Sequence, residues 1–160
     1  VRDAGVGEIL IGCGVAEHEE IPAGHPAVAL FDFTAVYMGV PVLEQRQEDY
    51  PYEILIDRAR TSWRNHASDA VSHMPYLPAG WSPRPWPDPR PWFAFPNREE
   101  WANALTEMKA ALEEYHTLGL PGRKAFTIYA WNEFGEGGIV APTRGDGTMK
   151  LEGIRTVFGP

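Results

Sequence analysis

The chain has 160 residues, 44% of them hydrophobic, and its 22 acidic and 14 basic side chains give a formal net charge of −8. This length and apolar content suit one folded domain and exclude wholesale disorder. The acidic balance argues against nucleic acid as a partner, and no apolar run approaches the ~20 residues that a membrane-spanning helix needs. One cysteine, Cys13, cannot form an internal disulfide. Because the chain begins at Val1 without Met or a secretory apolar segment, we expect the natural N-terminus to lie upstream.

Four short apolar runs predict buried β-strands. They cover residues 8–13, 27–33, 72–77 and 125–131. Their apolar character is continuous rather than strictly alternating, which suits strands covered on both faces, as in parallel sheets.

Three amphipathic segments predict helices. The first has an apolar stripe at spacings of three and four over residues 52–67. The second begins after Asn97, which forms a predicted capping box with Glu100, and it ends before Gly119. The third is short and starts near Met149.

The alternation of strands and helices predicts an α/β fold with a parallel sheet. Two architectures fit this order: a doubly wound open sheet, or part of a (β/α)₈ barrel. No glycine-rich phosphate loop follows the first strand, so nucleotide binding has little support. A complete barrel needs about 250 residues. In the barrel interpretation, residues 1–160 form one partial domain of about four βα units.

A long proline-rich segment covers residues 75–96. It contains eight prolines, with Trp81, Trp86 and three further Trp or Phe residues between them. Loops this long inside a compact domain are commonly functional, and α/β proteins place their sites after the carboxyl ends of strands. Arg84 and Arg90 can donate fork-shaped hydrogen bonds to hydroxyls or carboxylates. We predict that this loop lines the site; the alternative is a structural cover over the rim.

Glu133 and Glu136 follow the last predicted strand in a glycine-rich segment. In an extended chain these carboxylates would point to opposite faces, but the glycines permit a chain reversal that brings them together. Glycoside hydrolysis needs two carboxyl groups, one as proton donor and one as base or nucleophile. We expect both to open onto one concavity walled by Trp81 and Trp131. The alternative is a pair of solvated loop charges.

Two further candidates lie at the end of the second predicted strand or just after it. Asp32 is expected to lie near sugar hydroxyls, or else to make a structural hydrogen bond, and Tyr37 follows it closely. The five histidines show no metal-binding spacing, so we predict neither a metal nor a cofactor.

The sequence Tyr-Ala-Trp-Asn-Glu-Phe-Gly-Glu-Gly-Gly at 129–138 resembles the final strand of the glycoside hydrolase family 99-like proteins. This domain is also called WbsX in polysaccharide loci. Residues 79–85 look like that family's Gly-Trp-Asp-Pro-Arg-Pro element, with Ser82 in place of Asp. The family's endo-α-mannosidases have Trp-His where this chain has Phe134 and Gly135, so the sugar preference stays open.

The resemblance implies a (β/α)₈ barrel of which this chain supplies the last four βα units. It implies a retaining glycoside hydrolase in which Glu136 is the general acid that protonates the leaving oxygen. Glu133 would be the base that deprotonates the substrate's 2-hydroxyl, which then attacks the anomeric carbon. The residues expected to contact the substrate are Trp81, Arg84, Trp86, Tyr129, Trp131, Asn132, Asp32 and Tyr37.

The expected partner is an oligo- or polysaccharide. Two alternatives are a non-catalytic carbohydrate-binding barrel and a WbsX-type polysaccharide biosynthesis protein. The resemblance implies a secreted or periplasmic location. Since the first half of the barrel would be missing, we expect the isolated chain to have little activity.

Overall fold

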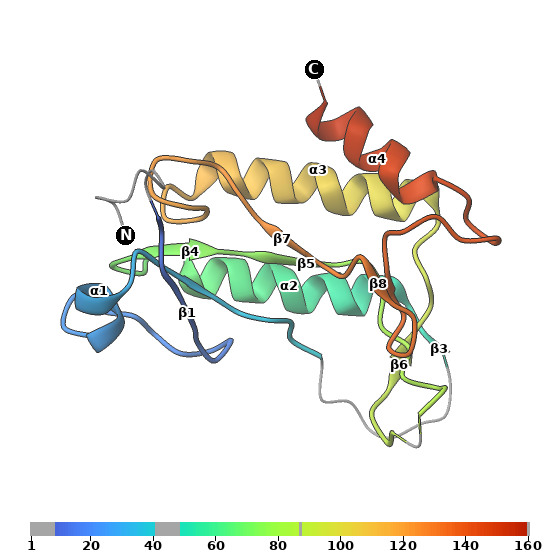
Figure 1. The fold of residues 1–160 in the computed structure, drawn as a ribbon, viewed down its shortest axis with the longest axis horizontal. Coiled ribbons are helices and arrows are strands. Elements are labelled where there is room, and N and C mark those ends of the chain that lie inside the picture. The colour runs from blue at the N-terminus through green and yellow to red at the C-terminus, as the bar shows by residue number, and fades with distance from the viewer. Residues whose placement is uncertain (1–8, 41–48, 87, 160) are drawn as a thin grey trace.

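The computed structural model describes residues 9–40, 49–86 and 88–159, which form an α/β fold (Figure 1). The helices of this described part are α1 (Pro26–Leu30), α2 (Tyr52–His66), α3 (Arg98–Glu114) and α4 (Met149–Phe158). Its strands are β1 (Gly12–Gly14), β2 (Phe33–Ala35), β3 (Asp49–Tyr50), β4 (Ser72–Met74), β5 (Tyr76–Pro78), β6 (Trp92–Phe93), β7 (Thr127–Tyr129), β8 (Asn132–Glu133) and β9 (Gly138–Ile139). None of these helices is both long and apolar enough to cross a membrane.

The main strands are parallel and follow one another in chain order. β1, β2 and β4 form one sheet, and β5 pairs with β7. β4 and β5 are separated only by Pro75, which has no amide hydrogen to donate to a strand ladder. The pairing partner changes at this residue, from β2 before it to β7 after it. The described strands form no closed barrel; β3 pairs with β6, and β8 with β9, in small separate ladders.

Side chains of α2 donate hydrogen bonds to backbone carbonyl groups of β5, on the edge of β5 that faces away from β7. The Trp63 indole N–H donates to the Tyr76 carbonyl at 2.8 Å, and the Tyr52 hydroxyl donates to the Pro78 carbonyl at 2.7 Å. On the other edge, the Ala79 amide donates to the Tyr129 carbonyl at 2.6 Å. The carbonyl groups of this buried strand therefore have donors although none of the described strands pairs with that edge.

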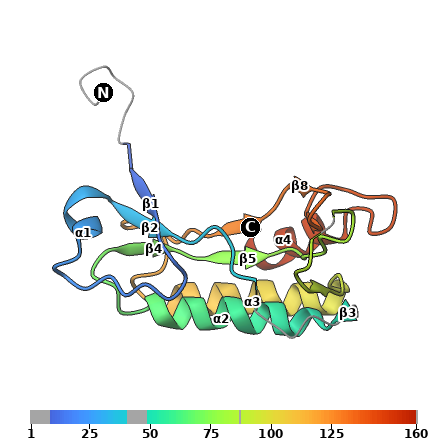
Figure 2. The ribbon, with the colours of Figure 1, turned by 90° about the horizontal axis from the view of Figure 1, so that it is seen from below.

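Helices α2 and α3 lie side by side on the same face of the sheet (Figure 2). Their apolar faces and β5 form the core, which includes Leu55, Ile56, Leu77, Trp101, Leu105 and Met108, all almost fully buried. α4 packs on α3, where the Trp101 indole N–H donates to the Lys150 carbonyl at 2.9 Å.

The structure confirms the three predicted helices and the strands near 72–77 and 125–131. The strand predicted at 27–33 is wrong: residues 26–30 form α1, and β2 starts at Phe33. The reason is local, because His25 caps the helix by accepting the Ala27 amide hydrogen and Pro26 occupies the first turn. The strand predicted at 8–13 lies later in the chain, as β1 at Gly12–Gly14. Glu8 lies outside the described residues.

The capping box predicted for α3 is present. The Asn97 side chain accepts hydrogen bonds from the amides of Glu99 (2.9 Å) and Glu100 (3.0 Å), and the Glu100 carboxylate accepts the Asn97 amide hydrogen at 2.8 Å. Three amides at the start of the longest described helix thus have acceptors.

We expect Asn97→Ala to lower the free energy of unfolding by about 1 kcal/mol, because two α3 amides lose their acceptor. Asn103, exposed within the same helix, offers a matched control: Asn103→Ala should leave stability unchanged or raise it slightly, since alanine favours helix. Urea unfolding of both variants measures the difference. Equal stabilities would contradict a stabilising role for the cap.

Candidate functional site

The β8–β9 hairpin carries both candidate glutamates beyond the carboxyl end of β7. In its turn, the Glu136 amide donates to the Glu133 carbonyl at 3.1 Å. Gly137 has a φ of 75°, whereas Gly135 and Gly138 stay outside the left-handed region. The sequence predicts a chain reversal here, and one of its three glycines provides the required conformation.

Gly135 and Gly138 instead permit close packing. A Cβ atom at Gly138 would lie 2.6 Å from a ring carbon of Tyr129, and one at Gly135 would overlap the indole of Trp86. The hairpin backbone therefore packs directly against both rings, which fixes its position relative to β7 and to the proline-rich loop.

The two glutamates occupy different environments. Glu136 is half-buried, its carboxylate accepts a hydrogen bond from the Tyr129 hydroxyl, and its carbonyl accepts the Ser82 amide hydrogen at 2.7 Å. Glu133 is exposed, and its carboxylate makes no hydrogen bond or ion pair with another described residue. One carboxylate is thus held in place while the other is free to approach a ligand.

Tyr129 links the hairpin to the interior. Its side chain is only 3% exposed, the Tyr37 ring meets it edge-on at 5.2 Å between centroids, and the Trp81 ring lies 6.2 Å away. Burial is the main cause that raises the pKa of Tyr129, and the hydrogen bond to Glu136 adds to it. The phenol therefore stays protonated and acts as a donor at neutral pH.

Part of the proline-rich loop is buried beneath the candidate site. Trp81 is 2% exposed, so it does not form an open wall; its indole N–H donates to the Pro91 carbonyl at 3.1 Å. The Arg90 guanidinium lies 4.5 Å over the Trp81 ring and pairs with Asp88 at 2.6 Å. Arg84 donates to the Ser82 hydroxyl at 2.8 Å. Both arginines are engaged within the loop.

An exposed group of aromatic side chains lies around the hairpin. Trp86 and Phe134 are each 59% exposed and Trp131 is 58% exposed, while the neighbouring Asn132 is also exposed. Large exposed apolar side chains in one region are typical of binding surfaces. These residues, unlike Trp81, are available to a ligand.

Asp32 and Tyr37 lie apart because β2 starts later than predicted. Asp32 precedes β2, and its carboxylate accepts the Ile11 amide hydrogen at 2.8 Å, which is a structural hydrogen bond. Tyr37 follows β2 and contacts Tyr129. In a parallel sheet, residues before and after a strand lie at opposite ends, so only Tyr37 reaches the hairpin's end.

A hollow of about 430 Å³ lies beside Tyr129, between the carboxyl ends of β1 and β2 and strand β7. Its lining includes Gly14, Val36, Tyr37 and Ile128. Neither Glu133 nor Glu136 is among its lining residues.

Lys150, which was not among the predicted site residues, connects α4 to the hairpin. Its ammonium group donates to the carbonyls of Ala79 (2.7 Å) and Ile139 (2.6 Å) and lies 5.6 Å from the Phe95 ring. Burial lowers the pKa of Lys150 to about 8. No sequence pattern predicts this, because a single lysine beside an apolar stripe is normally solvated.

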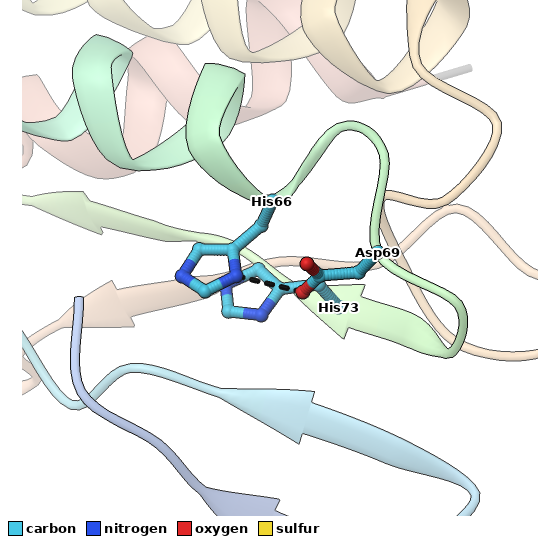
Figure 3. A group of neighbouring side chains, drawn as sticks. All are labelled: His66, Asp69 and His73. Carbon is cyan, nitrogen blue, oxygen red and sulfur yellow. Dashed lines mark hydrogen bonds and ion pairs between the residues drawn. The ribbon is translucent and has the colours of Figure 1, made fainter. Parts of the chain in front are cut away.

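A buried group of His66, Asp69 and His73 lies near the end of α2 that is far from the β8–β9 hairpin, and Figure 3 shows its side chains. The ring nitrogens and carboxylate oxygens of this group come within 4.8 Å of one another, close enough to suggest a metal site. His66 Nδ1 is 2.7 Å from Asp69 Oδ2, and His73 Nδ1 is 2.9 Å from the Thr34 hydroxyl. The spacing of these residues in the sequence does not predict the group, because its members lie at a helix end, in a loop and in a strand.

The geometry of this group does not suit a shared ion. The two imidazole rings stack with centroids 3.8 Å apart and planes 5° from parallel. Nitrogen lone pairs lie in the ring plane, so two parallel stacked rings cannot both direct a lone pair at one ion. The arrangement is that of a buried hydrogen-bonded cluster, and it leaves the Nε2 atoms of both histidines without partners among the described residues.

Comparisons of this chain with family models, curated proteins and solved structures give no match.

The buried cluster predicts loss of stability in acid. Burial, with a smaller contribution from His66, lowers the pKa of His73 to about 3, whereas an unfolded histidine titrates near 6.5. Below pH ~6.5 the unfolded chain binds a proton that the folded chain does not, so stability falls with pH until about 3. At pH 5 this group should account for a loss of about 2 kcal/mol.

Urea unfolding at pH 7 and pH 5 measures this effect. His73→Asn keeps a polar group near Thr34 but cannot titrate, so it should lose about 2 kcal/mol less stability than the unmodified chain between the two pH values. An identical loss in both proteins would show that His73 is not protected from protonation.

Proposed function

We propose that this chain is the last four βα units of a (β/α)₈ barrel that hydrolyses glycosidic bonds, with Glu133 and Glu136 as the catalytic pair. The observation that carries the proposal is the position of the β8–β9 hairpin. It follows β7 at the carboxyl end of a parallel pair, where barrel enzymes hold their catalytic residues.

The order of the strands supports a barrel over a doubly wound sheet. A doubly wound sheet reverses its strand order and has helices on both faces. Here the parallel strands lie in the same order as in the chain: β1, β2 and β4 in one sheet, then β5 and β7 in the next. Helices α2 and α3 lie on one face (Figure 2). In the proposed barrel the missing strands would lie beyond β1 and β7 and enclose the hollow beside Tyr129.

The environments of the two glutamates support different chemical roles. A glycosidase needs one carboxyl group to protonate the leaving oxygen and one to act as base or nucleophile. The held carboxyl of Glu136 suits a proton donor of defined direction, and the exposed Glu133 suits a base that approaches the substrate's 2-hydroxyl. These are the roles that the resemblance to the family 99-like proteins implies.

The surface around the hairpin supports a carbohydrate as ligand. Trp86, Trp131 and Phe134 expose aromatic faces on which sugar rings can stack. The net charge of −8 and the engagement of Arg84 and Arg90 within their own loop leave little positive charge for a polyanion. The same surface would serve a non-catalytic carbohydrate-binding barrel, which would bind glycans without turnover.

Activity is tested on the full-length parent protein, since the proposed barrel needs its other strands to orient a substrate. We expect Glu136→Gln to reduce the rate about 10²- to 10⁴-fold on glycosides with poor leaving groups. The loss should be much smaller on activated aryl glycosides, because these need little protonation.

Glu133→Gln provides the comparison, since a lost base should slow both substrate classes similarly. Equal losses for Glu136→Gln on both classes would argue against a general acid. Glycan binding by the parent protein without any turnover would favour the binding barrel instead.

A further inference from the structure

We propose that Tyr129 is a positioning residue for Glu136: its hydroxyl holds one carboxylate oxygen so that the other alone faces the ligand. This inference rests on the proposed function for the role of Glu136, and it changes the role of Tyr129, which was expected to contact the sugar.

Tyr129 is fixed before any ligand arrives. It is the last residue of β7, and its carbonyl accepts the Ala79 amide hydrogen at 2.6 Å. Its ring is 3% exposed and contacts the Tyr37 ring edge, with interplanar angle 72°, as well as the Trp81 ring. A side chain so enclosed cannot turn its hydroxyl away from Glu136 without repacking these neighbours.

Glu136 is held at a second place, its own backbone. Its carbonyl accepts the Ser82 amide hydrogen at 2.7 Å, and the next residue, Gly137, has a left-handed backbone. A Cβ atom at Gly137 would lie 2.7 Å from the Ser82 nitrogen, so this close approach requires glycine. With its backbone and Oε2 both fixed, the side chain has little freedom left, and Oε1 has no hydrogen-bond partner among the described residues.

The hydroxyl of Tyr129 acts as a donor in both states of Glu136. When Glu136 is protonated, the proton resides on Oε1, because Oε2 accepts the phenol hydrogen. When Oε1 releases that proton, its O–H bond breaks, an O–H bond forms on the leaving oxygen, and the negative charge spreads onto Oε2. The hydrogen bond from Tyr129 strengthens as this charge develops. Tyr129 keeps its own proton throughout, consistent with the burial that raises its pKa.

The first measurement needs no activity. Tyr129→Phe keeps the ring and its aromatic contacts but removes the donor. Carboxyl labelling with a carbodiimide and an amine nucleophile, read by mass spectrometry on the tryptic peptide 125–144, reports Glu133 and Glu136 separately. We expect the labelling ratio of Glu136 to Glu133 to rise several-fold in Tyr129→Phe. Tyr115→Phe, which alters a half-buried tyrosine at the end of α3, should leave the ratio unchanged.

The second measurement separates positioning from substrate contact. In the full-length protein, Tyr129→Phe should lower kcat about 10- to 100-fold on glycosides with poor leaving groups and change KM by less than about threefold. Circular dichroism of each variant confirms that it is folded.

The possible outcomes are distinct. An unchanged labelling ratio in folded Tyr129→Phe overturns the proposal, and so does a raised KM with kcat unchanged, which would mean that Tyr129 binds the sugar. A raised ratio in a parent protein that hydrolyses no glycoside would uphold the contact between Tyr129 and Glu136 and refute the proposed function.

Discussion

Buried carbonyl groups must have hydrogen-bond donors, and the way in which β5 meets this constraint determines much of the architecture. Pro75 separates β5 from β4, and side chains of α2 then take the place of a neighbouring strand on one edge of β5. Since these donors are the ends of Tyr52 and Trp63, the helix is fixed in both position and rotation. Loss of either ring would both leave a cavity in the core and deprive a β5 carbonyl of its hydrogen-bond donor.

The same strand determines where the candidate site forms. The chain leaves β5 through Ala79, bonded to β7, and reaches Ser82, whose amide holds the backbone of Glu136. The proline-rich loop is therefore part of the structure that shapes the hairpin, and its buried Trp81 packs near Tyr129. Stability and the candidate chemistry depend here on the same few contacts, so substitutions in this loop are expected to affect both.

Local patterns predicted the parts of the fold that local interactions determine. The capping box at Asn97 and the apolar stripe of α2 each depend on residues within a few positions of one another, and both are confirmed. The error at 27–33 has the same origin, since a cap at His25 outweighs the β-propensity of the run that follows. That error moved Asp32 from the end of a strand to its beginning.

The candidate site was only partly predictable because it depends on contacts between distant segments. The glycine-rich sequence predicted a chain reversal between Glu133 and Glu136, and the β8–β9 hairpin contains one, but nothing local indicates that the Tyr129 hydroxyl would bond to Glu136. Likewise, a tryptophan in a proline-rich loop gives no sign of its burial, which distinguishes Trp81 from the exposed Trp86. The cluster of His66, Asp69 and His73 exists only once a helix and a strand are packed.

Lys150 gives the hairpin a connection that does not depend on charge. A neutral amine retains two N–H groups, as many as its two carbonyl partners require, so deprotonation near pH 8 leaves both hydrogen bonds possible. Between about pH 8 and the ordinary lysine value near 10.5, the unfolded chain binds a proton that the folded chain has released, so this residue favours folding more as the pH rises. Arginine at this position would stay charged and could not relieve its burial in this way. The last helix therefore stays hydrogen-bonded to the hairpin in alkaline solution, through weaker bonds than those of the ammonium group.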